Sequence, residues 1–234
     1  MGLNIIFEDE QILVVKKDVG IPVEAGRLRI MDLQGLIKNE LYRRNRKGGE
    51  PYLGLIHRLD QPVEGVLVVG RTKEAAAKLN KQLASGTLNK KYLAVVHLEK
   101  EDVEKKGTFT DYLLKDGQVA KIISSNIKEA KNIKDAKEAR LHYQILQKRD
   151  ELALVDVEIE TGRFHQIRCQ MAYHGMPLLG DAKYGSSVSQ ALSLKEGIRH
   201  VALCANRIAF KHPLTSKELS FEVKPENKAF AKFL

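Results

Sequence analysis

The sequence of 234 residues contains no tryptophan, only two cysteines and only six prolines. Cys169 and Cys204 cannot build a disulfide framework, which predicts a protein of the reducing cytoplasm. No apolar run approaches the roughly 18 residues that a membrane-spanning helix requires, and the N-terminal segment shows no basic-then-apolar signal pattern. These absences argue against a secreted domain stabilised by disulfide bonds and against a helical membrane protein. The length of the chain allows a substantial globular core.

Positive charge is in excess, because 39 Lys and Arg residues oppose 30 Asp and Glu residues for a formal net charge of +9. This balance favours an anionic partner, for which RNA, DNA and a membrane surface are the candidates. Residues 38–58 concentrate the cations Lys38, Arg43, Arg44, Arg46, Lys47 and Arg58. Such a segment fits either a solvated surface loop or a loop that contacts phosphates.

Apolar periodicity predicts helices at residues 31–42 and 73–84, the second capped by Thr72. Strands are predicted at residues 5–9, 12–17, 63–70, 90–98, 109–114, 119–123, 140–147 and 152–160. We expect the charge-dense stretch 99–138 to be an exposed excursion of hairpins. Because strands follow one another with few helices between them, the pattern predicts an α+β fold with a mainly antiparallel sheet, in one catalytic domain that can have two lobes.

Several common chemistries lack their motifs. His165 and Cys169 stand four residues apart, but no CxxC pair, HExxH motif or nearby ligand cluster completes a metal site. The sequence also has no GxSxG elbow, no P-loop and no GxGxxG after a strand. We therefore expect neither a metal nor a cofactor.

The most informative segment is TGRFHQIRCQMAYHGMP, residues 161–177. It predicts a helix from Arg163 to His174, with Thr161 as a plausible N-cap and Gly175 at its end. At helical spacing, Arg168 falls within the apolar stripe of Phe164, Ile167, Met171 and Ala172, whereas Gln166 and Gln170 lie away from the centre of that stripe. A buried arginine must be paired: it can bind a structural carboxylate, or it can hold a functional anion in a cleft.

Asp60 is one candidate for that anion, since it lies directly before the buried run that starts at Val63. An aspartate followed by Gln61 and Pro62 also fits an ordinary turn, in which the carboxylate bonds backbone N–H groups. Local sequence leaves both interpretations open.

Taken together, these blocks resemble the RluA-type RNA pseudouridine synthases, and they occur in the order of that family. The matching segments are residues 8–23, LIHRLDQPVEGVLVVGRT at 55–72, KKYLAVV at 90–96, the arginine helix and its loop at 161–185, and HVALCANRIAFKHP at 200–213. The resemblance implies a pseudouridine synthase catalytic domain over residues 1–234, with a mixed, mainly antiparallel sheet split into two lobes around a central catalytic cleft. It leaves no room for a separate N-terminal RNA-binding domain ahead of Asn4.

By motif position, the resemblance makes Asp60 the essential aspartate, Tyr92 the tyrosine that stacks on the target base, and Arg168 the basic residue that pairs with the aspartate. Such a pair would keep Asp60 ionised. The remaining substrate-binding residues it implies are His57, Arg58, Arg163, His165 and, in the apolar uracil pocket, Leu203. Two departures stand out: Asp18 replaces a usual proline, and residues 61–64 replace a more common Arg-x-Thr-Ser.

The implied function is isomerisation of specific uridines to pseudouridine in structured ribosomal or transfer RNA, by a monomeric cytoplasmic enzyme that uses neither a metal nor a membrane. The carboxylate can act as a nucleophile or as the base that starts glycal formation, and the sequence does not choose between them. An alternative is an RNA-binding or folding factor on the same scaffold for which catalysis is dispensable. A carboxylate-based hydrolase is a third reading, but it lacks a second catalytic carboxylate.

Overall fold

The computed structural model describes residues 2–25, 31–44, 49–124, 130 and 133–234. The chain forms two compact units, each of which is built from two segments of the sequence. Unit 1 comprises Met1–Lys90 and Ala205–Pro225, and unit 2 comprises Lys91–Cys204 and Glu226–Leu234. Arg46 and Lys47, part of the basic segment noted in the sequence, lie outside the described residues.

Unit 1 contains a sheet that begins with the predicted N-terminal strand pair, β1 (Asn4–Glu8) and β2 (Ile12–Lys17). The antiparallel partner of β2 is β4 (Glu64–Gly70), which is buried along its whole length. The short β3 (Gly54–Leu55) pairs with β4. Strand β10 (Leu203–Lys211), which belongs to this unit from Ala205 onward, pairs with β11 (Glu218–Glu222). The predicted apolar strand at residues 63–70 is thus confirmed.

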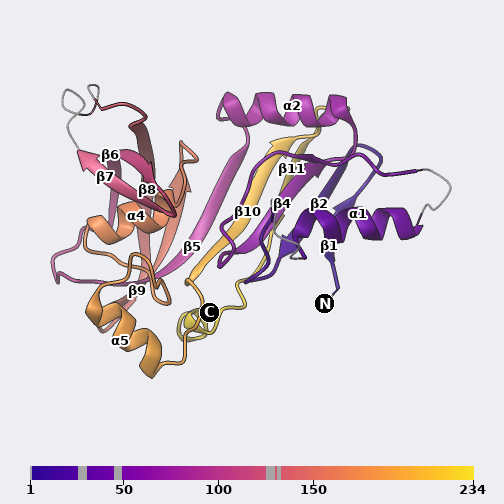
Figure 1. Cartoon of the computed structure of the whole chain (residues 1–234). Coiled ribbons are helices and arrows are strands. Elements are labelled where there is room, and N and C mark those ends of the chain that lie inside the picture. The colour runs from indigo at the N-terminus through magenta and orange to yellow at the C-terminus, as the bar shows by residue number, and fades with distance from the viewer. Residues whose placement is uncertain (1, 26–30, 45–48, 125–129, 131–132) are drawn as a thin grey trace. The chain divides into compact units, whose positions relative to one another are not determined.

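The two helices of unit 1 follow the predicted positions closely. Helix α1 spans Leu33–Arg44 and buries Leu33, Ile37 and Leu41. Helix α2 spans Lys73–Ala84, and the hydroxyl of Thr72 accepts a hydrogen bond from the backbone N–H of Ala75. Leu79 of α2 is fully buried in a core cluster with Val14 of β2 and Val68 of β4, so α2 covers one face of this sheet (Figure 1).

Unit 2 contains an antiparallel sheet in the order β5-β9-β8-β6-β7. The strands are β5 (Asn89–His97), which enters the unit at Lys91, and β6 (Lys106–Asp116), β7 (Val119–Ser124), β8 (Lys137–Arg149) and β9 (Leu152–Ile159). The predicted hairpin of β8 and β9 turns at Asp150, whose φ is 52°. The segment 99–138 forms hairpins as expected, but its described strands are not an exposed excursion, because β6 pairs with β8 and buries Asp111.

The helices of unit 2 are α4 (Gln166–Tyr173) and α5 (Ser187–Lys195), and the 3₁₀ turn η1 (Lys228–Lys232) follows near the C-terminus. Prediction placed the start of α4 too early. His165 occupies the N-cap with a left-handed φ of 53°, which helical backbone cannot adopt, so the helix begins at Gln166. Thr161 is not the cap, since its hydroxyl donates to the side-chain oxygen of Gln166.

The predicted apolar stripe of α4 also needs correction. Phe164 precedes the helix and is exposed, whereas Gln166 and Gln170 are buried together with Arg168. Gln170 donates from Nε2 to the buried carboxylate of Asp111 on β6, at 2.7 Å. Helix α4 is therefore buried around most of its circumference. The buried side chains of Gln166, Arg168 and Gln170 each donate hydrogen bonds, whereas Oε1 of Gln170 is buried and accepts none from the described residues.

Candidate active site

Asp60 lies half-buried in unit 1, in a turn that leads into β4. The turn is closed through the main chain, because the N–H of Val63 donates to the carbonyl of Asp60 at 3.0 Å. Gly20 and Gln61 exchange two further bonds: the N–H of Gly20 donates to the Gln61 carbonyl, and Nε2 of Gln61 donates to the Gly20 carbonyl. Two main-chain hydrogen bonds and one from the Gln61 side chain thus fix the turn that carries Asp60.

Lys17, which the sequence interpretation did not single out, ties this turn to β2. Its side chain is fully buried, and Nζ donates to the carbonyls of Asp18, Ile21 and Gln61 at 2.9, 2.8 and 3.1 Å. Burial lowers the pKa of Lys17 to about 8, although the nearby carboxylates, with Asp60 first among them, act in the opposite direction. The ammonium is therefore still mostly protonated at neutral pH. Lys17 ends a strand that the structure buries on both faces.

Two residues that precede Asp60 in the same motif have different surroundings. His57 packs inward, with Nε2 lying 3.5 Å from the backbone N–H of Val68. Burial and the charge of Lys90 lower the pKa of His57 to about 3, so its ring is neutral at physiological pH. Arg58 is exposed, and its guanidinium lies 3.8 Å from a carboxylate oxygen of Glu24. Of the two, only Arg58 offers a positive charge to a phosphate.

Arg168 is the buried cation of unit 2, with an exposed fraction of only 3%. Its Nε and Nη2 atoms donate to the two carboxylate oxygens of Asp181, at 2.7 and 2.8 Å. The same carboxylate accepts the backbone N–H groups of Lys183 and Tyr184. The expectation that Arg168 must be paired is confirmed. Asp181 is a partner that the sequence interpretation missed, because it treated residues 180–185 only as a loop.

The loop after Asp181 holds Arg168 from a second side. The guanidinium carbon of Arg168 lies 5.2 Å from the centre of the Tyr184 ring, within the range of a cation–π interaction. The hydroxyl of Tyr184 accepts the N–H of Ala120 at 2.6 Å and bonds to Nδ1 of His165 at 2.9 Å. Burial raises the pKa of Tyr184 to about 12, so its hydroxyl keeps its proton. Arg168, Asp181 and Tyr184 therefore form one rigid group.

Tyr92 and Leu203 are both buried in unit 2. Tyr92 lies opposite Val157 of β9, which in turn lies opposite Tyr143 of β8, so these three side chains share one face of the sheet. This is the face on which α4 packs, as the stacking of His174 on Phe109 and the ring contact between Phe109 and Tyr143 show. Tyr92 and Arg168 thus belong to the same side of the unit 2 sheet.

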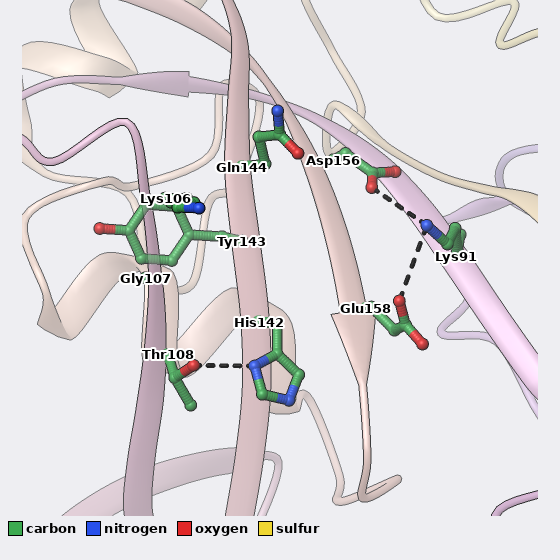
Figure 2. Close-up of a pocket in the computed structure, with 9 residues that line it drawn as sticks. All are labelled: Lys91, Lys106, Gly107, Thr108, His142, Tyr143, Gln144, Asp156 and Glu158. Atoms are coloured by element: carbon green, nitrogen blue, oxygen red, sulfur yellow. Dashed lines mark hydrogen bonds and ion pairs between the residues drawn. The ribbon is translucent and has the colours of Figure 1, made fainter.

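A polar depression of about 450 Å³ lies on the unit 2 sheet (Figure 2). Its lining residues are Lys91, Lys106, Gly107, Thr108, His142, Tyr143, Gln144, Asp156 and Glu158. Lys91 lies 3.6 Å from Asp156 and 3.6 Å from Glu158, so these charges are already paired. Because neighbouring residues of a strand point to opposite faces, Lys91 projects away from the face of Tyr92. None of the predicted catalytic residues lines this depression.

The described residues contain no group of three or more His, Cys, Asp or Glu side chains that could hold a metal ion. His165 and Cys169, which stand four residues apart in the sequence, make other contacts. His165 bonds to Tyr184, and the thiol of Cys169 donates to the carbonyl of Ala120. Burial raises the pKa of the Cys169 thiol to about 11, which leaves it protonated and unreactive at neutral pH.

Comparison with known proteins decides the family. Residues 11–173 match the family model described as RNA pseudouridylate synthase. This chain belongs to the RNA pseudouridylate synthase family. It is 33% identical over 238 residues to the uncharacterised RNA pseudouridine synthase YlyB of Bacillus subtilis, covering 98% of this chain and 71% of that protein. It is 31% identical over 224 residues to the ribosomal large subunit pseudouridine synthase D of Zymomonas mobilis, covering 94% of this chain and 68% of that protein.

Solved structures support the same fold. The human structure called RNA Pseudouridylate Synthase Domain Containing 4 matches with a TM-score of 0.76 and 22% identity, covering 98% of this chain and 92% of that chain. The predicted α+β pseudouridine synthase fold and the predicted enzyme class, an RNA pseudouridine synthase of the RluA type, are confirmed. No helix in the described part of the chain is long and apolar enough to span a membrane.

Proposed function

We propose that this synthase converts specific uridines of structured RNA to pseudouridine with Asp60 as the essential carboxylate and Arg168 as the cation that pairs with it. The observation that carries the proposal is the construction around Arg168. A buried ion pair is seldom the most stabilising way to fill a core, yet this chain buries Arg168 and orients it with Asp181 and Tyr184. Because a guanidinium has five N–H donors, binding Asp181 through two of them is compatible with a second anionic partner.

The chemistry assigns a task to each group. The C1′–N1 bond of the uridine breaks, the uracil rotates, a bond forms between C1′ and C5, and the proton on C5 is lost while N1 gains one. Asp60 either attacks as a nucleophile or removes a proton to start glycal formation. Tyr92 offers its ring to the flipped base and assists loss of the C5 proton, and Leu203 lines the apolar side of the uracil pocket.

The surrounding cations fit an RNA partner, but they are not equivalent. Arg43 and Arg44 of α1 form ion pairs with Glu40, so a phosphate would have to compete for them. Arg58 and Arg163 are exposed, and we propose that they contact the RNA backbone. We place His57, which is neutral, behind the catalytic turn as support rather than at a phosphate. His165 acts through its contacts with Phe164 and Tyr184.

Ribosomal RNA of the large subunit is the first substrate to test, because the Zymomonas relative is named for it. An unmodified transcript of that RNA and a pool of unmodified transfer RNA transcripts are each incubated with the enzyme, and pseudouridine is mapped by chemical labelling. We expect product at defined uridines in one of the two pools, without added metal or cofactor. We also propose that the enzyme acts in the cytoplasm as a monomer. Absence of product in both pools would contradict the proposal.

The alternative, an RNA-binding or folding factor, is tested in a deletion strain. Asp60→Ala is expressed at the wild-type level, and growth and ribosome assembly are measured. If the catalytic role is the physiological one, Asp60→Ala does not complement. Full complementation would favour the alternative, which is motivated by the net charge of +9 and by the altered segment after Asp60.

A further inference from the structure

Phe164 is an aromatic residue that the fold leaves at the surface. Its exposed fraction is 39%, although it directly precedes α4, whose first six residues are buried. The sequence pattern placed Phe164 in the buried stripe of that helix. The left-handed backbone of His165 instead turns it outward before the helix begins. An exposed ring beside such a strained backbone position is a feature typical of a binding site.

The ring is held in a fixed orientation. Phe164 and His165 stack with centroids 3.8 Å apart and an interplanar angle of 20°. His165 is itself buried and is bonded at Nδ1 to the hydroxyl of Tyr184. The ring of Tyr184 in turn lies against Arg168. A continuous set of contacts therefore joins Phe164 to the cation that we assign to the catalytic site.

The charges around the ring favour an anionic ligand that carries a flat group. Lys115 Nζ lies 4.9 Å from the centroid of the Phe164 ring, at the exposed end of β6. Arg163, the preceding residue, is exposed and donates from Nε to the carbonyl of Glu138. A nucleobase with its phosphate satisfies both features, since the base stacks on the ring and the cations contact the backbone.

We propose that Phe164 is a stacking platform for a nucleobase next to the target uridine, with Lys115 and Arg163 holding the adjoining phosphates. This inference rests on the proposed action on RNA and extends it to a neighbouring nucleotide. The flexible side chain of Lys115 leaves the ring when the base arrives and moves to the phosphate. The occupant is RNA, because a nucleotide carries a flat base and a phosphate next to each other, as the ring and the two cations require.

The test is a binding titration with an unmodified large-subunit ribosomal RNA transcript, with every variant in the Asp60→Asn background so that no turnover occurs. Phe164→Ala should weaken binding by roughly 5- to 150-fold, the range for loss of one base–aromatic stack. Phe164→Tyr should bind within about twofold of the parent, because it keeps the ring. Leu194→Ala is the matched control, since Leu194 is an exposed apolar residue of α5 away from these contacts.

Salt dependence separates the ring from the cations. Lys115→Ala should lower the slope of log Kd against log salt concentration by about one, whereas Phe164→Ala should leave the slope unchanged. Thermal unfolding confirms that each variant is folded. The stacking role would be contradicted if Phe164→Ala bound the transcript as tightly as the Asp60→Asn parent. It would also be contradicted if Leu194→Ala lost as much affinity as Phe164→Ala. The two proposals can fail separately. If Phe164→Ala weakens binding as expected but the wild-type enzyme forms no pseudouridine on any RNA, the proposed function is wrong and the stacking role of Phe164 is still supported.

Discussion

The two units hold their proposed catalytic charges in different ways. In unit 1, Asp60 projects from a turn fixed by main-chain hydrogen bonds, and Lys17 binds three carbonyl oxygens there. In unit 2, Arg168 is fixed by side chains, through two bonds to Asp181 and the ring of Tyr184. Changing one side chain should therefore disturb Arg168 more than it disturbs the turn of Asp60.

The largest expected effect on stability comes from breaking the buried pair in unit 2. Arg168→Met leaves the carboxylate of Asp181 buried without this partner and should lower the free energy of unfolding by about 3–5 kcal/mol. The double variant Arg168→Met/Asp181→Leu should regain most of that loss and still form no pseudouridine. Urea unfolding and product formation are measured together; a double variant as unstable as the single one would show that the pair is not the cause.

A change of charge alone in the same pair separates an effect on catalysis from an effect on RNA binding. Asp181→Asn keeps the shape and one acceptor but loses the charge that orients Arg168. We expect kcat to fall by about 10- to 100-fold, as for a misplacement on the order of 1 Å, with little change in KM for RNA. A rise in KM at constant kcat would instead assign Asp181 to RNA binding.

In unit 1, Lys17→Met removes the donor to three carbonyl groups and should cost about 1–3 kcal/mol of unfolding free energy at pH 7. The cost should depend on pH, because the pKa of Lys17 falls from 10.5 to about 8 on folding. Between these two values the unfolded chain binds the extra proton, so rising pH favours the folded wild type. The stability gap between wild type and Lys17→Met should therefore widen from pH 8 to pH 10. A gap that is constant across this range would contradict the assignment.

The smallest effect concerns the starts of the helices. Helix α2 has a side-chain cap from Thr72, whereas α4 has no side-chain cap hydrogen bond from His165. Thr72→Ala should lower the free energy of unfolding by about 1 kcal/mol. Thr72→Ser keeps the capping hydroxyl and should be nearly as stable as the wild type. Chemical denaturation of the three proteins checks this, and equal stability of all three would argue against the cap.

The sequence predicted the features that depend on local pattern. Helix α2 carries its cap at Thr72 and its core positions at Ala75 and Leu79, so its bounds could be predicted correctly. The start of α4 could not, because the ring of His165 is bonded to the hydroxyl of Tyr184, which lies 19 residues further along the chain. Regular periodicity contains no information about such a contact.

The candidate site divides in the same way. Resemblance to a family selected Asp60, Tyr92 and Arg168 by motif position, and their roles stay predictions. The residues that support them were not visible. Asp181 meets Arg168 only when the loop after α4 folds back, and Lys17 becomes a buried cation only when the segment 18–21 closes over it. Both depend on tertiary structure and not on local sequence.

The proposed function depends on the carboxylate of Asp60, which carries the reaction. Single-turnover assays on an unmodified large-subunit ribosomal RNA transcript, with enzyme in excess, measure this role. Asp60→Asn should bind the transcript with an affinity close to that of the wild type and form pseudouridine at less than about one thousandth of the wild-type rate. Asp60→Asn that forms pseudouridine at the wild-type rate would contradict the claim.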